Sequence, residues 1–113
     1  MLVGVTNLNS DELLKHCGSA ESLIQYSVEL VPTYFRHQKA IVDNQRYLVA
    51  VYVRNLFKND YNKWHPLCEG LLEGVHITGT VTNLYSCTDL LEACDTEILY
   101  KYIDKAKMEA HDA

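Results

Sequence analysis

The chain has 113 residues, of which 48% are hydrophobic and 22% are charged, with a formal net charge of −5 at pH 7. This balance predicts one globular domain over residues 1–113 and excludes a disordered or low-complexity chain. The longest apolar run, residues 47–53, is too short to cross a bilayer as a helix, and residues 1–12 lack the basic and apolar regions of an export signal. We therefore expect an intracellular protein, in the cytoplasm or the nucleus, with no membrane partner.

A short edge strand at residues 2–5 and a helix over residues 10–17 are the first predicted elements. Asn9, followed three residues later by Glu12, resembles a capping box that starts this helix. Gly18 is placed to end the helix in the left-handed conformation that glycine adopts without strain.

Residues 21–31 fit two structures. Their apolar residues suit one face of a helix, but they also alternate with polar residues as in a strand. Ser19 as a second N-cap and Pro32 as a stop favour the helix. The strand stays open as the alternative.

Residues 40–42 and 47–53 are rich in β-branched and aromatic side chains, which favour strands. Residues 43–45, Asp-Asn-Gln, lie between them and suit a turn. The pattern predicts a β-hairpin, and its second arm is apolar on both faces, as in a central strand covered on both sides.

Three further elements follow. Pro66 near the start and Gly74 just beyond the end predict a short helix over residues 66–72. Alternating residues predict a strand over 75–84. Residues 88–109 predict a long helix with one apolar stripe, formed by Leu91, Cys94, Ile98, Tyr102 and Ala106.

These elements together predict the α+β class. We expect a small, mostly antiparallel sheet of roughly three to five strands, compatible with an OB-like barrel. The long C-terminal helix and the shorter helices would cover this sheet.

Chemistry-bearing residues are present without a strong signature. No glycine-rich phosphate loop occurs. The four cysteines are Cys17, Cys68, Cys87 and Cys94, and with no leader or N-glycosylation sequence beside them we expect reduced thiols. A zinc site would draw on His16, Cys17, His65 and Cys68. Because no catalytic constellation is recognisable, we expect no enzyme and no cofactor, and a small thiol- or zinc-dependent enzyme remains the third hypothesis.

Charge is distributed unevenly along the chain. Residues 34–64 carry six basic, two acidic and seven aromatic residues, a net charge of +4, whereas the rest of the chain carries −9. Such a division predicts a surface for an acidic partner, or for the acidic part of a second copy.

The sequence therefore predicts a small, non-enzymatic binding or regulatory protein. It would dock on another protein, or on itself, through the predicted basic aromatic hairpin and the loop that follows, because Tyr, Trp and Arg dominate interface hot spots. Binding of single-stranded DNA or RNA on the same surface is the alternative, since cations and stacked rings also grip nucleic acid. Packing of the aromatic residues inside a sheet would explain them without any partner. The predicted binding residues are Arg46, Tyr52, Arg54, Phe57, Lys58, Tyr61, Lys63 and Trp64.

Overall fold

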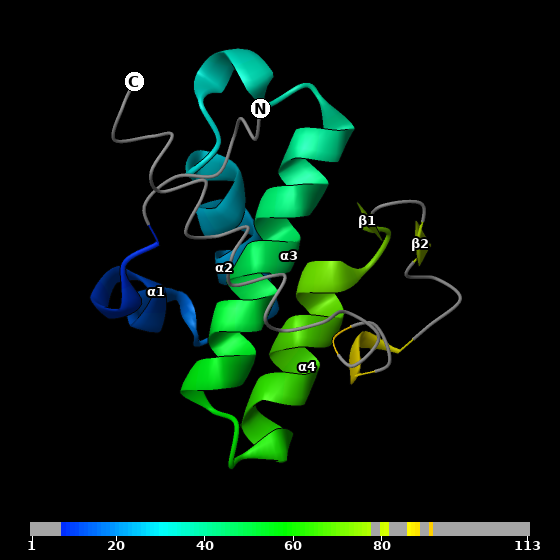
Figure 1. Ribbon diagram of the computed structural model, residues 1–113. Coiled ribbons are helices and arrows are strands. Elements are labelled where there is room, and N and C mark those ends of the chain that lie inside the picture. The colour runs from blue at the N-terminus through cyan, green and yellow to red at the C-terminus, as the bar shows by residue number, and fades with distance from the viewer. Residues whose placement is uncertain (1–7, 78–79, 82–85, 89–90, 92–113) are drawn as a thin grey trace.

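The structure, a computed structural model, describes residues 8–77, 80–81, 86–88 and 91 (Figure 1). Most of these residues are helical. The elements are α1 (Ser10–His16), α2 (Ala20–Glu29), the 3₁₀ helix η1 (Thr33–Phe35), α3 (Lys39–Leu56), α4 (Tyr61–Leu72), and the two-residue strands β1 (His76–Ile77) and β2 (Thr80–Val81), which pair antiparallel.

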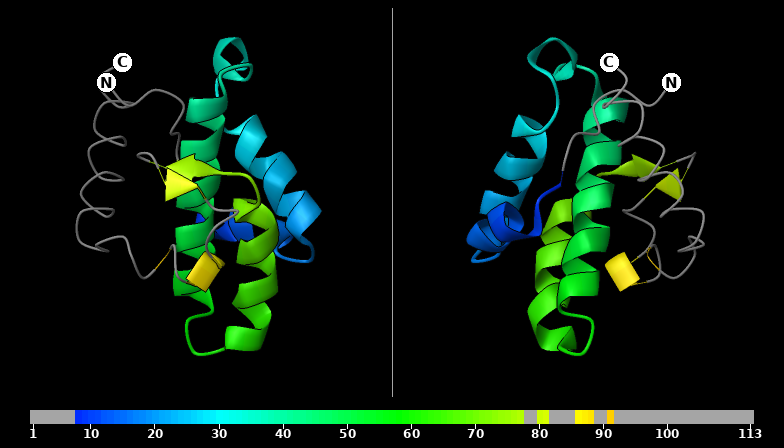
Figure 2. Two further views of the ribbon diagram at one scale, coloured as in Figure 1. Left: turned by 90° about the vertical axis from the view of Figure 1, so that its right-hand side faces the viewer. Right: turned by 60° about the vertical axis from the view of Figure 1, so that its left-hand side comes forward.

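The predicted α+β class, with an OB-like sheet under helices, is therefore wrong. Within the described residues, the β1–β2 pair is the whole of the strand structure, and α2, α3 and α4 pack on one another to form the body of the molecule (Figure 2). Within the predicted single strand over 75–84, the structure describes two short strands, β1 and β2, that pair with each other instead of forming one continuous strand. The predicted strand at residues 2–5 lies outside the described residues.

Helix α3 replaces the predicted β-hairpin. Five consecutive residues, 47–51, are buried, as is Val53, because other elements cover α3 on most of its sides. A helix in such a position has no polar stripe, so its apolar run resembles that of a central strand. Asp43 and Gln45, expected in a turn, are buried on this helix.

The first two helices begin where the sequence predicts. The Asn9 side chain accepts hydrogen bonds from the backbone N–H groups of Asp11 (2.9 Å) and Glu12 (3.4 Å). The Ser19 hydroxyl accepts one from the N–H of Ser22 at 3.1 Å. The helix predicted for residues 21–31 is confirmed as far as Glu29, where α2 ends. Local capping bonds need no tertiary context, which is why the sequence reveals them.

The ends of the helices agree less well with the prediction. Gly18 is not in the left-handed region, and Cys17 caps α1 instead. Gly74 does follow α4 in the left-handed region, with φ at 74°. Helix α4 begins at Tyr61, five residues before the predicted start, so Pro66 lies inside it.

A buried carboxylate joins the end of α4 to α3. Asp43 accepts hydrogen bonds from Lys39 Nζ (2.6 Å) and from the backbone N–H of His76 (3.1 Å). Lys39 Nζ also donates to the carbonyl oxygen of Gly74 at 2.9 Å. These bonds satisfy a charge that would otherwise be costly to bury, and they hold β1 against α3.

One hydrophobic cluster runs from Leu8 to Leu91 and includes side chains of α1, α2, α3 and α4. Leu91 belongs to the predicted C-terminal helix, most of which lies outside the described residues. In the part of the chain that the structure describes, no helix has the length and apolarity needed to cross a membrane.

Candidate functional site

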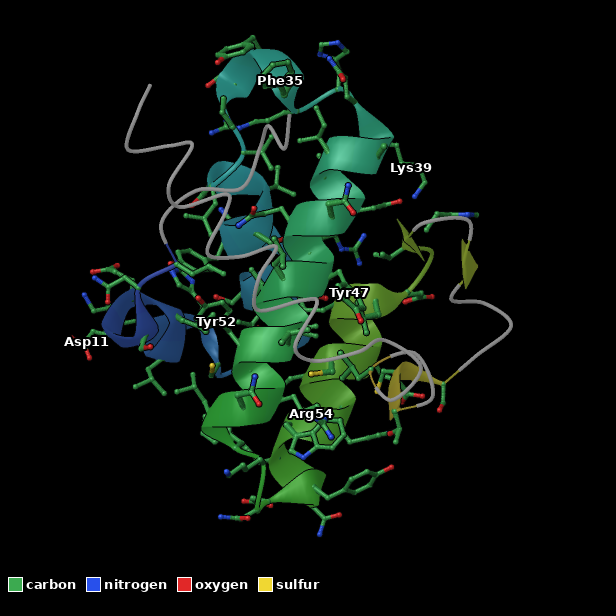
Figure 3. The ribbon with its side chains drawn as sticks, in the orientation of Figure 1. Asp11, Phe35, Lys39, Tyr47, Tyr52 and Arg54 are labelled. Carbon is green, nitrogen blue, oxygen red and sulfur yellow. The ribbon has the colours of Figure 1, made fainter. Side chains whose placement is uncertain are left out.

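Six of the eight predicted binding residues come together where α3 ends and α4 begins. We call this group the α3–α4 junction, and its members are Arg54, Phe57, Lys58, Tyr61, Lys63 and Trp64. The turn between the two helices lies at one end of the molecule, opposite η1 (Figure 1). Figure 3 shows Arg54 on α3 near this end.

Trp64 is the centre of the junction. Its side chain is buried, with 5% exposure, and the Arg54 guanidinium carbon lies 5.7 Å from the centre of its ring system. The Tyr61 ring meets Trp64 edge-on, with 5.1 Å between the ring centres. Cation–π and edge-to-face contacts of this kind fix the relative positions of the three side chains.

Tyr61 is the exposed aromatic residue of the junction. It is 51% exposed, although its ring stacks on that of His65 with 4.6 Å between centres. Tyr61 and His65 are four residues apart on α4, a spacing that places side chains on one face of a helix. His65 is thus a member of the site that the hairpin hypothesis missed, and the spacing would have revealed it had the helix been recognised.

The other two cations of the junction are Lys63 and Lys58. Lys63 Nζ lies 5.6 Å from the centre of the Phe57 ring and donates a hydrogen bond to the carbonyl oxygen of Cys17 at 3.3 Å, so the junction touches the end of α1. Lys58 is exposed in the turn. Asp60 uses its carboxylate to cap α4, accepting from the N–H of Lys63 at 3.2 Å.

Arg46 and Tyr52 lie outside the junction. Arg46 donates to the carbonyl oxygens of Gly70 (3.2 Å) and Glu73 (3.4 Å) at the end of α4. Burial lowers the pKa of Arg46, and the carboxylates of Asp43 and Glu73 oppose this shift. Tyr52 packs against the core. Residues two apart share a face of a strand but lie about 200° apart around a helix, so α3 separates Tyr52 from Arg54.

The candidate zinc ligands are engaged elsewhere. His16 stacks on Tyr26 and its Nδ1 lies 2.9 Å from the Ser22 hydroxyl. Cys68 donates to the carbonyl oxygen of Ala50, and burial raises the pKa of its thiol well above the ordinary value. Among the described residues, no three His, Cys, Asp or Glu side chains gather as metal ligands would.

Comparisons of the chain with family models, with curated proteins and with solved structures find no match. The function must therefore be argued from the junction itself. The junction presents one half-exposed ring, Tyr61, held against a buried indole and an imidazole, and its cations Arg54 and Lys63 lie over the rings of Trp64 and Phe57. Cys87, the other buried thiol nearby, has its pKa raised by burial to about 11, so it is protonated at neutral pH and is a weak nucleophile.

Proposed function

We propose that this chain is a helical docking module that binds another protein through the α3–α4 junction. The half-exposed Tyr61 ring, fixed between His65 and Trp64, is the observation that carries this proposal. A side chain that is already ordered loses little conformational entropy on binding, so more of its contact energy appears as affinity. Tyr, Trp and Arg are also the residue types most enriched in hot spots.

The charges of the junction indicate what kind of partner would fit it. Arg54 lies over the Trp64 ring that the Tyr61 ring meets, Lys63 lies beside Phe57, and Asp60 is tied to the start of α4 by its capping bond. Lys58 is exposed in the turn between the two helices. A partner with an apolar pocket for the Tyr61 ring and carboxylates around that pocket would match this arrangement. Such complementarity speeds association and rejects wrong partners more than it adds affinity.

Single-stranded nucleic acid fits the junction less well. Binding of that kind uses several rings in succession, each with a free face for a base. Trp64 is buried, and one face of Tyr61 is already covered by His65. One free ring face and three cations, on a chain with a net charge of −5, favour a protein partner.

Affinity capture from the native host tests the proposal, with Tyr61→Ala as the test variant. Tyr34→Ala is the matched control, because Tyr34 is another exposed tyrosine but lies on η1 at the opposite end. Tyr61→Ala should weaken binding of the captured partner about tenfold or more, as expected of a hot spot, while Tyr34→Ala should retain it.

Two outcomes would count against the proposal. If both variants retain the same partners as the wild type, the junction is not the docking surface. If the protein instead retains a single-stranded oligonucleotide at low salt, and Lys58→Ala with Lys63→Ala abolishes this, nucleic acid replaces protein as the ligand class.

A further inference from the structure

Resting on the proposed function, we infer that His65 makes docking through the α3–α4 junction depend on pH, with stronger docking when its imidazole is protonated. Histidine is the side chain whose charge ordinarily changes between about pH 5 and 8. The imidazole of His65 stacks on the Tyr61 ring and lies 3.8 Å from the Glu69 carboxylate. Protonation of this imidazole therefore changes the surroundings of the ring on which docking depends.

The stack between Tyr61 and His65 is the first support for this inference. The two ring centres are 4.6 Å apart and the ring planes are inclined by 29°, so the imidazole lies over the face of the Tyr61 ring. The face of an aromatic ring carries a negative potential and attracts a cation. An imidazolium should therefore hold the Tyr61 ring more firmly than a neutral imidazole does.

Glu69 favours the charged form of His65. Its Oε2 atom lies 3.8 Å from Nδ1 of His65, four residues further along α4. The two side chains form an ion pair only when the imidazole is protonated, which adds an attraction that the neutral ring lacks. The His65 side chain is 21% exposed, so it can exchange its proton with the solvent.

Neighbours from two other parts of the chain also bear on His65. The thiol of Cys87 donates a hydrogen bond to the carbonyl oxygen of His65 at 3.5 Å, and burial raises the pKa of this thiol to about 11, so it stays neutral while His65 titrates. Arg54 lies over Trp64, whose ring centre is 5.9 Å from that of His65, and its charge opposes protonation. We therefore expect the small effect of a partly exposed cation–π contact, about two- to fivefold.

Protonation of His65 should act on docking in one direction. A Tyr61 ring that is held more firmly loses less conformational entropy when it is bound. The added positive charge also suits a partner that carries carboxylates, which is the kind of partner that the cations of the junction indicate. Both effects strengthen docking as the pH falls from about 8 to 5.

A double-mutant cycle on the full chain tests the contact without any partner. Urea unfolding of the wild type, Tyr61→Ala, His65→Ala and the double variant gives the coupling between the two side chains, at pH 5 and at pH 8. Expressed as a factor in the unfolding equilibrium constant, the coupling should be about two- to fivefold larger at pH 5. His65→Gln, which takes up no proton, gives a second cycle with a less disruptive substitution. A coupling that is equal at the two pH values, or larger at pH 8, overturns the inference.

Affinity capture at the same two pH values tests the link to docking. The protein captured by the wild type should be retained more strongly at pH 5, and His65→Gln should remove this difference. His37→Gln is the matched control, because His37 is an exposed histidine just after η1, at the opposite end of the molecule, and this variant should keep the difference.

Failure of the inference and failure of the proposed function give different results. If the wild type and His65→Gln respond equally to pH, the inference is overturned, and loss of the captured protein in Tyr61→Ala still supports docking through the junction. If Tyr61→Ala retains the captured protein at both pH values, the proposed function fails and the inference fails with it, even where the coupling between Tyr61 and His65 depends on pH.

Discussion

Gly70 sets how closely α4 approaches α2. A Cβ atom added at this position would lie 2.4 Å from the Cβ of Ala20, which is too close without a shift of the helices. Over-packing costs about 1–3 kcal/mol, and the better helix propensity of alanine returns up to about 1 kcal/mol. We expect Gly70→Ala to lower the free energy of unfolding by about 1–2 kcal/mol in urea titrations.

Gly18 offers the matched control for this prediction. A Cβ there would meet nothing within 4 Å, and its φ is not left-handed. Gly18→Ala should leave the stability unchanged or raise it by up to about 1 kcal/mol, through a less flexible unfolded chain. Adding Ala20→Gly to Gly70→Ala should restore part of the loss. Equal stability of Gly70→Ala and the wild type would mean that α2 and α4 are further apart.

Cys87 makes the stability depend on pH in the alkaline range. Burial, with a smaller contribution from the Glu69 carboxylate, raises the pKa of its thiol from 9.0 to about 11. Between these values the unfolded chain releases the proton while the folded chain keeps it, so the unfolded state binds fewer protons. The free energy of unfolding should therefore fall as the pH rises from 9.0 to 11.

Urea titrations of the wild type and of Cys87→Ala over that pH range measure this effect. The variant should lose less stability, relative to its own value at neutral pH, than the wild type does. A smaller fall should remain, because burial also raises the pKa of Cys17 and Cys68. Identical pH slopes in the two proteins would show that Cys87 is not shielded from water in the fold.

At the scale of elements, α1 and α2 were predictable and α3 was not. Asn9 and Ser19 mark the starts of α1 and α2 in the sequence, because the capping bonds form between residues that are close in the sequence. Whether the α3 segment forms a helix or a strand depends on the elements that cover it, since an apolar run such as residues 47–53 is compatible with a buried helix or a buried strand. Asp43 also contributed to the wrong hairpin prediction, because aspartate is typical of turns. Only the folded structure shows that Asp43 is bonded to Lys39 and His76.

Asn44 distinguishes the helix from the hairpin by experiment. In α3 it is an interior helical residue, whereas in the predicted hairpin it would be the middle of the turn. A helix favours alanine over glycine at this position by about 1 kcal/mol, whereas a turn favours glycine. We expect Asn44→Ala to be more stable than Asn44→Gly by about that amount in thermal and urea unfolding. The reverse order would contradict the helix.

Over the whole molecule, the charge pattern singled out the segment that forms the junction, but it could not predict which residues of that segment contact one another. The basic, aromatic middle of the sequence contains the junction, because its residues cluster within eleven positions from Arg54 to Trp64 and any turn would bring them together. Which of them meet depends on helical phase. That phase directs Arg46 to the end of α4, buries Trp64, and brings His65 beside Tyr61.

Trp64 allows the cooperativity of unfolding to be measured by fluorescence, because it is the only tryptophan in the chain. It lies at the junction and also belongs to the hydrophobic cluster that includes α1, α2 and α3. If that cluster unfolds as one unit, tryptophan fluorescence and far-ultraviolet circular dichroism should give the same urea midpoint. Fluorescence that changes first would mean that the junction opens by itself. The Tyr61 ring would then not be held in place before binding, and the entropic argument for its role as an anchor would fail.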